Sequence, residues 1–139
     1  MPSFYIASRL ENIAQVQELR DLLHAADWEC LYDWTIHGSI RGPEAGERLR
    51  RVSVEELGAA SDADVVVVLL PGGRGTHVEL GAALSSHDPT VVVWSPDPDR
   101  DFGTEQGTCA FYHHPRITRR ADVTTAGLAA WLLTLYPRR

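Results

Sequence analysis

The sequence predicts one doubly wound α/β domain over residues 1–139, of the flavodoxin or Rossmann-like type, built on a mostly parallel five-stranded sheet. The chain's 139 residues suit a single domain with one core. Short β-branched and aromatic segments alternate with segments of helical periodicity. The segment Asp64–Leu70 (DVVVVLL) is almost continuously apolar, which is typical of a central strand buried on both faces. A glycine-rich turn and a helical pattern follow this strand directly.

The first part of the chain predicts a strand, a helix and a second strand, which together form a βαβ unit. Ser3–Ala7 (SFYIA) is rich in aromatic and β-branched residues, as strands are. From Glu11 to Ala26, apolar residues recur at helical spacing and form one stripe. Trp28–Asp33 (WECLYD) predicts the second strand. Trp34–Gly42 (WTIHGSIRG) has two glycines and no clear period, so we expect a loop that covers the site.

The middle of the chain predicts helices on either side of the central strand. Pro43 is well placed for the first turn of a helix. Ser53 and Glu56 have the S-x-x-E spacing of a capping box, which indicates that this helix restarts at Ser53. Val78–Ser85 predicts the helix after the central strand. Each helix would connect two parallel strands by a right-handed crossover.

The last part of the chain is expected to complete the sheet and cover it with a final helix. Four elements are expected there: a buried strand at Thr90–Trp94, a long loop at Ser95–Gly107, a short last strand at Phe111–His114 stopped by Pro115, and a helix capped by Thr124 or Thr125 that runs through Tyr136. Right-handed crossovers make 2-1-3-4-5 the expected strand order. The loops after Ala7 and Leu70 would then face each other at the switch point, where such sheets bind ligands.

The composition excludes several classes of function. The formal net charge of -6 argues against charge-driven binding to a nucleic acid polymer or an anionic membrane. Neither Cys30 nor Cys109 belongs to a C-x-x-C pair; one disulfide stays open, but we expect a reduced cytoplasmic protein. We see no signal peptide and no apolar run long enough for a membrane helix. His113 and His114 are adjacent and would point to opposite faces of a strand, so we expect no metal. No cofactor is expected either.

The glycine-rich stretch Pro71–Ser86 (PGGRGTHVELGAALSS) is the strongest functional signal in the chain. Its glycines allow a tight turn, and the amides at the start of the following helix attract negatively charged groups. Thr76 and Glu79 have the T-x-x-E spacing of a capping box. Glu79 therefore has two interpretations, a capping residue or a carboxylate held at the mouth of a site as a nucleophile. The stretch matches neither a P-loop nor a full G-x-G-x-x-G fingerprint.

Three segments, YIASRLEN, AASDADVVVVLLP and GRGTHVELGAAL, resemble the nucleoside 2-deoxyribosyltransferase family, and in particular the nucleotide N-glycoside hydrolases of that superfamily. The resemblance covers about residues 4–95. It implies that Glu79 attacks C1′ of the sugar while a base leaves, and that Tyr5 orients this glutamate. It also implies an acid/base role for Glu56, where relatives usually carry Asp. Two other interpretations stay open: Tyr5 as a core aromatic residue and Glu56 as the capping partner of Ser53.

The resemblance also indicates where the substrate would bind. Relatives usually carry Asp or Ser six residues before the nucleophile to hold the 5′ end of the substrate, but here that residue is Gly73. Backbone amides or arginine side chains would have to replace it. Substrate contacts are therefore expected from the two loops at the switch point and from a loop tryptophan, namely Ser8, Arg9, Gly72, Gly73, Arg74, Gly75, Thr76, His77 and Trp34.

These observations favour an enzyme that cleaves the N-glycosidic bond of a nucleoside or nucleoside 5′-monophosphate, with hydrolysis favoured over base transfer. One alternative is a nucleotide-sensing module without turnover, because Glu56 and Gly73 both depart from the family pattern. The other is an NAD glycohydrolase, since the nicotinamide–ribose bond is also N-glycosidic. Family members assemble as dimers or larger oligomers, so the resemblance implies a homodimer.

Overall fold

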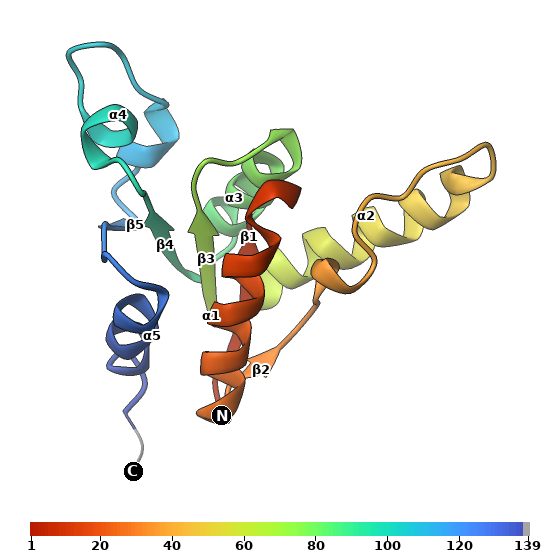
Figure 1. Cartoon of the computed structure of the whole chain (residues 1–139), viewed down its shortest axis with the longest axis horizontal. Helices are drawn as coiled ribbons and strands as arrows, with labels where there is room; N and C mark the ends of the chain where they lie inside the picture. The colour runs from red at the N-terminus through yellow and green to blue at the C-terminus, as the bar shows by residue number, and fades with distance from the viewer. Residues whose placement is uncertain (138–139) are drawn as a thin grey trace.

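A computed structural model of the chain, which describes residues 1–137, contains one sheet of five parallel strands in the order β2-β1-β3-β4-β5 (Figure 1). This finding confirms the predicted α/β class and strand order. The strands are β1 (Ser3–Ala7), β2 (Glu29–Cys30), β3 (Val65–Leu69), β4 (Thr90–Trp94) and β5 (Ile117–Arg120). The switch point lies between β1 and β3, because the chain crosses from β1 to β2 on one side of the sheet and from β3 to β4 on the other.

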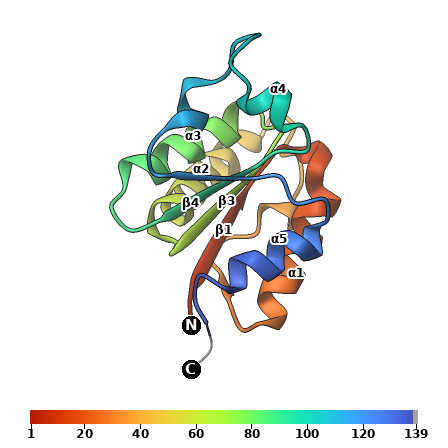
Figure 2. The same cartoon turned by 90° about the vertical axis from the view of Figure 1, so that its left-hand side faces the viewer.

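Helices cover both faces of the sheet, as a doubly wound fold requires (Figures 1 and 2). They are α1 (Ile13–Ala25), α2 (Ala45–Asp62), α3 (Arg74–Ser85), α4 (Pro98–Phe102) and α5 (Thr125–Leu133), with single 3₁₀ turns η1 (Leu10–Asn12), η2 (Trp34–Ile36) and η3 (Ala110–His113). On one face α1 packs against α5, and on the other α2 packs against α3. The loops after β1 and β3 therefore open between α1 on one side and α2 and α3 on the other.

The core is built on the valine-rich central strand. Every residue of β3 is buried, because β1 and β4 flank it and helices cover both its faces. On one face the core is completed by Leu19 and Leu23 of α1 and by Leu128 and Leu132 of α5. Burial of this apolar surface is the main contribution to folding, and it fixes the strand ends from which the site loops leave.

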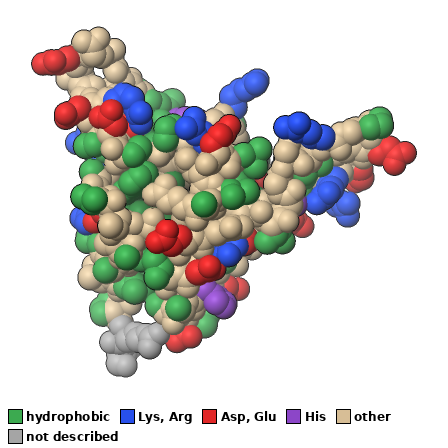
Figure 3. Space-filling view, in the orientation of Figure 1, with side chains coloured by type: hydrophobic (Ala, Val, Ile, Leu, Met, Phe, Trp, Pro, Cys, Tyr) green, Lys and Arg blue, Asp and Glu red, His purple; other side chains and the backbone are tan. Residues whose placement is uncertain are grey.

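Helix α2 differs from its prediction. The sequence indicated a restart at Ser53, but the helix is continuous, and the Ser53 hydroxyl donates to the carbonyl of Arg50 at 2.7 Å. The proposed capping box of Ser53 and Glu56 is therefore wrong. Only the last turns of α2, with Ala59 and Ala60, are buried among its residues, while its first half projects from the body of the domain (Figure 1). Charged side chains stand on this projecting part (Figure 3).

The edges of the sheet also differ from their predictions. The second strand was expected at Trp28–Asp33, but β2 contains two residues, and Asp33 caps the turn η2 that follows. The segment Phe111–His114 falls on the turn η3 (Ala110–His113) and its C-cap and is not a strand, and the last strand lies beyond Pro115. Phe111 is exposed and Tyr112 is buried, which mimics the alternation of a strand.

The segment between β4 and β5 is not a plain loop. Within the predicted loop Ser95–Gly107, helix α4 begins at Pro98, and the side chain of Asp97 accepts from the amide of Arg100. At the C-terminal helix, Thr124 and not Thr125 is the cap, since its Oγ1 accepts from the amide of Gly127 at 3.0 Å. That helix ends at Leu133, before the predicted end at Tyr136.

Candidate active site

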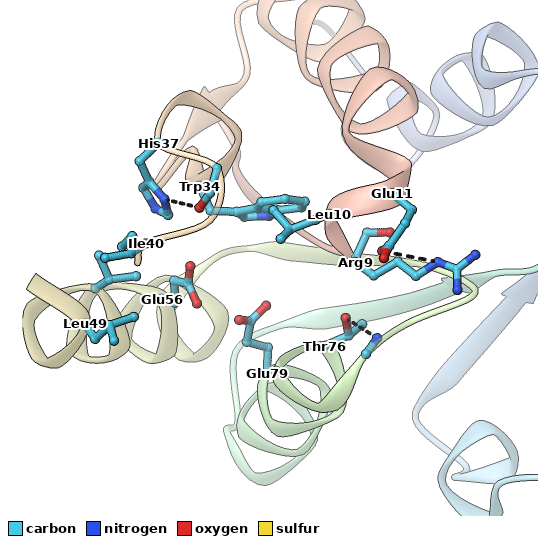
Figure 4. A pocket seen from close by; sticks show the side chains of 15 residues that line it. Arg9, Leu10, Glu11, Trp34, His37, Ile40, Leu49, Glu56, Thr76 and Glu79 are labelled. Carbon is cyan, nitrogen blue, oxygen red and sulfur yellow. Dashed lines mark hydrogen bonds and ion pairs between the residues drawn. The ribbon is translucent and has the colours of Figure 1, made fainter. Parts of the chain in front are cut away.

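A cavity of about 390 Å³ lies at the carboxyl ends of β1 and β3, at the switch point of the sheet. The loop after β1, the glycine loop after β3, the loop after β2 and the projecting part of α2 all contribute to its walls (Figure 4). Its volume lies within the range of small-molecule sites. The location agrees with the general rule for open α/β sheets.

Glu79 faces this cavity although it is almost fully buried. Its side chain is 7% exposed and comes from the second turn of α3. Its Oε1 accepts a hydrogen bond from the hydroxyl of Tyr5 at 2.9 Å. Tyr5 is fully buried on β1, so this bond fixes one carboxylate oxygen and leaves the second oxygen for other contacts. The predicted pairing of Tyr5 with Glu79 is present in the structure.

A second carboxylate, Glu56, points from α2 toward Glu79 across the cavity (Figure 4). Burial and then the negative charge of Glu56 raise the pKa of Glu79 to about 8, against a lowering by the Tyr5 hydroxyl. Burial and the charge of Glu79 raise the pKa of Tyr5, so Tyr5 stays a neutral hydrogen-bond donor. The site thus holds two carboxyl groups in an environment that favours keeping a proton between them.

The local interpretation of Glu79 as a capping residue is wrong. Helix α3 begins at Arg74, with Gly73 at the N-cap, so Thr76 is its third residue and not its cap. The Oγ1 of Thr76 accepts from the amide of Gly73 at 3.0 Å, while Glu79 bonds to Tyr5. Thr76 thus closes the glycine loop, and the carboxylate of Glu79 is directed toward Tyr5.

Gly72 is required by close packing. A Cβ atom on Gly72 would lie 2.6 Å from the Cγ2 atom of Thr76, which is buried and cannot move aside cheaply. Only glycine at this position lets the loop pass under Thr76. The glycine loop and the first turn of α3 lie at the edge of the cavity, where Gly73, Gly75 and Thr76 line the wall.

The opposite wall is mostly apolar and includes the predicted tryptophan. Trp34 is 6% exposed, and its Nε1 donates to the carbonyl of Ile6 at 2.8 Å, which fixes the ring against the end of β1. The loop that carries it is anchored by Asp33, whose carboxylate accepts from Arg20 at 2.6 Å. The other apolar side chains of this wall are Leu10, Ile40, Leu49 and Val52. Such a surface suits a flat aromatic group.

The loop after β1 has both a structural and a lining role. The hydroxyl of Ser8 donates to the carbonyl of Leu69 at 2.7 Å, which ties the ends of β1 and β3 together. Asn12 completes this tie, since its Nδ2 donates to Ser8 Oγ at 2.8 Å and to the carbonyl of Pro71 at 2.9 Å. The Nε atom of Arg9 lies 3.8 Å from Oε2 of Glu11, and both side chains are exposed at the rim of the cavity. Arg9 therefore already has an anionic neighbour.

The structure brings most of the predicted site residues together. Beside Glu79 and Glu56, the cavity is lined by six of the predicted substrate contacts: Ser8, Arg9, Trp34, Gly73, Gly75 and Thr76. Three others, Gly72, Arg74 and His77, are not among the described lining residues. Gly72 supports Thr76, Arg74 is exposed, and His77 bonds to Gly73 and Tyr112.

Sequence reasoning missed several contributors to the site. Asn12 gave no local signal, because its role depends on Pro71, which lies far away in sequence. Leu49 and Val52 of α2 line the cavity because the helix projects past the sheet, and helical spacing alone does not show this. His37 also lines the cavity, and its Nε2 lies 3.0 Å from the hydroxyl oxygen of Tyr32, a contact that the spacing of the two residues does not reveal.

Two further findings concern residues 1–137. Within this range, no three or more His, Cys, Asp or Glu side chains are grouped so that they could hold a metal ion. None of the helices described there is both long and apolar enough to cross a membrane.

Comparison with known proteins supports the fold. No protein-family model matches the sequence, and no curated protein matches it by sequence. Among solved structures, the chain is similar to the CMP N-glycosidase BcmB of Clostridium botulinum, with a TM-score of 0.60 and 13% sequence identity. The match covers 96% of this chain and 99% of that chain. At this identity the likeness shows a shared α/β fold over nearly the whole length of both proteins.

Proposed function

We propose that this chain cleaves the N-glycosidic bond of a nucleoside or nucleoside 5′-monophosphate, with Glu79 as nucleophile and water as the final acceptor. The observation that carries the proposal is the setting of Glu79. It is a carboxylate almost fully buried, held by Tyr5 on one oxygen, and directed at a cavity that a second carboxylate also faces. The fold shared with a CMP N-glycosidase and the sequence resemblance support the same chemistry.

The chemistry would proceed in two displacements. An ionised oxygen of Glu79 attacks C1′, the bond from C1′ to the base nitrogen breaks, and a glycosyl ester forms on Glu79. The departing base takes a proton from Glu56, which faces the same cavity. Water then attacks C1′, the ester bond from C1′ to Glu79 breaks and restores the carboxylate, and a proton of the water passes to Glu56. The products are the sugar and the free base. Two carboxyl groups with these separate roles are the usual equipment of retaining glycosidases.

The walls of the cavity suggest how the substrate would lie. The base would pack on the apolar wall with Trp34, and the 5′ end would reach the amides of the first turn of α3. Gly73 offers no side chain there, so backbone amides would replace the Asp or Ser of relatives. Arg9 is the one arginine among the described residues that line the cavity. It would contact a 5′-phosphate if the substrate carries one.

A chromatographic screen for free base tests the proposal. The wild-type chain is incubated with nucleosides, nucleoside 5′-monophosphates and NAD, beside Glu79→Gln and the control Glu55→Gln, which removes an exposed carboxylate one residue before Glu56. We expect base release by the wild type and the control, and a loss of at least about 10³-fold in Glu79→Gln. Equal release by Glu79→Gln would contradict the proposal. Nucleotide binding without any release would support the sensing alternative, and nicotinamide release would support the NAD alternative.

We also propose that the protein forms a homodimer in a reducing, cytoplasmic environment. Helix α2 leaves Leu49, Val54 and Leu57 exposed by 47%, 69% and 39%, which is unusual for one helix of a small domain. Light scattering coupled to gel filtration should give about twice the monomer mass of 15.4 kDa, and Leu57→Glu should lower it. A monomer at micromolar concentration would contradict the dimer.

Cys30 and Cys109 are both free thiols, in keeping with the proposed reducing, cytoplasmic environment.

A further inference from the structure

His77 lies beside the cavity but holds the glycine loop instead of lining the site. Its Nδ1 is 2.7 Å from the carbonyl oxygen of Gly73, and its Nε2 is 2.7 Å from the hydroxyl of Tyr112. A carbonyl oxygen can only accept, so Nδ1 carries the proton of the neutral ring. Nε2 then accepts a hydrogen bond from the Tyr112 hydroxyl. One histidine thus connects two segments that are 35 residues apart in sequence.

Gly73 depends on these contacts because it has no side chain of its own. Its carbonyl accepts from the ring of His77 and, at 3.3 Å, from the backbone amide of the same residue. Its amide donates to Thr76 Oγ1. Gly73, Gly75 and Thr76 line the cavity, whereas His77 is not among the described lining residues. The position of this wall therefore depends on a group behind it.

Tyr112 gives His77 a firm support. It is 9% exposed and lies in η3, within the segment of residues 95–116 that connects β4 to β5. Its ring packs edge-on against Phe102 of α4, with centroids 6.2 Å apart, and lies 5.8 Å from the ring of His77. Burial raises the pKa of Tyr112 to about 12, so its hydroxyl remains a donor at neutral pH. The folded segment between β4 and β5 is thereby attached to the glycine loop.

We infer that His77 and Tyr112 are positioning residues, which hold Gly73 and the first turn of α3 in place for the 5′ end of the substrate. The inference rests on the proposed function and deepens it, since it assigns a task to two residues that are not among the described lining residues of the cavity. It also gives His77 a role different from the direct substrate contact expected from the sequence. Because the hydrogen bonds of the pair hold Gly73 and not Glu79, the pair should affect KM more than kcat.

Three variants test the pair against two controls. Tyr112→Phe removes one hydrogen bond to His77, His77→Ala removes both bonds, and His77→Asn keeps a donor near the place of Nδ1. Exposed His87→Asn and Tyr136→Phe make matched changes far from the cavity. For Tyr112→Phe we expect KM to rise about three- to tenfold with kcat within about twofold, as the loss of one neutral hydrogen bond implies. His77→Ala should show a larger rise, and His77→Asn should recover most of it.

An unchanged KM in Tyr112→Phe and His77→Ala, or an equal loss of kcat in both, would overturn the inference. Amide NMR provides a readout that needs no turnover, so a wild type that releases no base would overturn the proposed function alone. In Tyr112→Phe, the resonances of Gly72, Gly73 and Gly75 should shift, while those of distant Gly58 and Gly127 should not. Absence of that shift would overturn the inference whatever the activity of the wild type.

Discussion

Two carboxylates of this domain, Asp33 and Glu79, lie close to the same cavity in opposite electrostatic settings. Asp33 accepts from the guanidinium of Arg20 at 2.6 Å and from the hydroxyl and amide of Thr35. Burial raises the pKa of Asp33, but the hydrogen bonds from Thr35 and Arg20 outweigh burial, and the pKa is lowered. Glu79 has one hydrogen-bond donor, Tyr5, and a second carboxylate as its neighbour, and its pKa is raised. Asp33 therefore stays ionised and holds a loop, whereas Glu79 shares a proton with the neighbouring carboxyl group of Glu56.

The difference indicates which group serves structure and which is available for chemistry. A carboxylate that only supports the fold is best paired with a cation and hydrogen-bond donors, as Asp33 is. None of the ion pairs described for residues 1–137 includes Glu79. Burial of a carboxylate without a cationic partner costs free energy and does not stabilise the fold. Groups kept in such costly settings are often functional.

Among the variants around these two carboxylates, Tyr5→Phe is expected to lower the activity most. The change removes the donor to Glu79 Oε1 and leaves the ring in the core. We expect kcat/KM to fall about 10- to 100-fold, because the carboxylate is no longer oriented. Since the Tyr5 hydroxyl lowers the pKa of Glu79, the fall of activity at alkaline pH should also move to higher pH. Steady-state kinetics from pH 5 to 10 check both, with Tyr136→Phe as control; an unchanged profile would contradict the role of Tyr5.

A smaller effect is expected from Glu56→Gln on the pH dependence. Attack requires an ionised Glu79 together with a proton on Glu56, so the active form of the pair carries one proton, and kcat/KM of the wild type should fall as pH rises above about 8. Glutamine at residue 56 removes the proton donor and also a negative charge that raises the pKa of Glu79. The variant should therefore lose the fall above pH 8, and its lower rate should instead rise with pH, with a midpoint below about 8 where Glu79 ionises. A fall above pH 8 that persists in Glu56→Gln would contradict the role of Glu56.

The smallest effect concerns stability, where the two carboxylates should behave in opposite ways. The stabilising contribution of Glu79 is present below its ordinary pKa of 4.5 and is lost as pH rises toward about 8. Glu79→Gln should therefore be more stable than the wild type by about 1–2 kcal/mol at pH 8, and the gain should vanish near pH 4. Asp33→Asn should lose about 1 kcal/mol at pH 7, because its contribution is present above its ordinary pKa of 3.8. Urea unfolding at several pH values measures both; equal signs at pH 8 would contradict the comparison.

The sequence predicted the centre of the fold better than its edges. Ser3–Ala7 and Thr90–Trp94 are strands with the predicted bounds, because their apolar residues fit only a buried strand. At the edge, Ile117–Arg120 is partly exposed and carries two arginines, so its pattern gives a weak signal. Phe111–His114 offered a better alternation, yet Pro115 and the packing of Tyr112 make it a 3₁₀ turn.

The site could be predicted in part, and for a specific reason. Local spacing fitted a capping role for Glu79 as well as a catalytic one, and the family resemblance decided between them. The bond between Tyr5 and Glu79 spans 74 residues, so no local pattern contains it. The apolar wall depends on how far α2 projects past the sheet, and that is set by tertiary packing of Ala59 and Ala60. Long-range geometry of this kind is absent from residue spacing.

The most direct test of the central claim is to trap the sugar on Glu79. A 2′-fluoro nucleoside that still loses its base should slow the second displacement and let the glycosyl ester accumulate. Mass spectrometry of the intact chain should then show the added mass of one sugar, and peptide mapping should locate it at Glu79, with no adduct in Glu79→Gln. Base release without any adduct, or with the adduct on another residue, would contradict the assignment of Glu79 as the nucleophile.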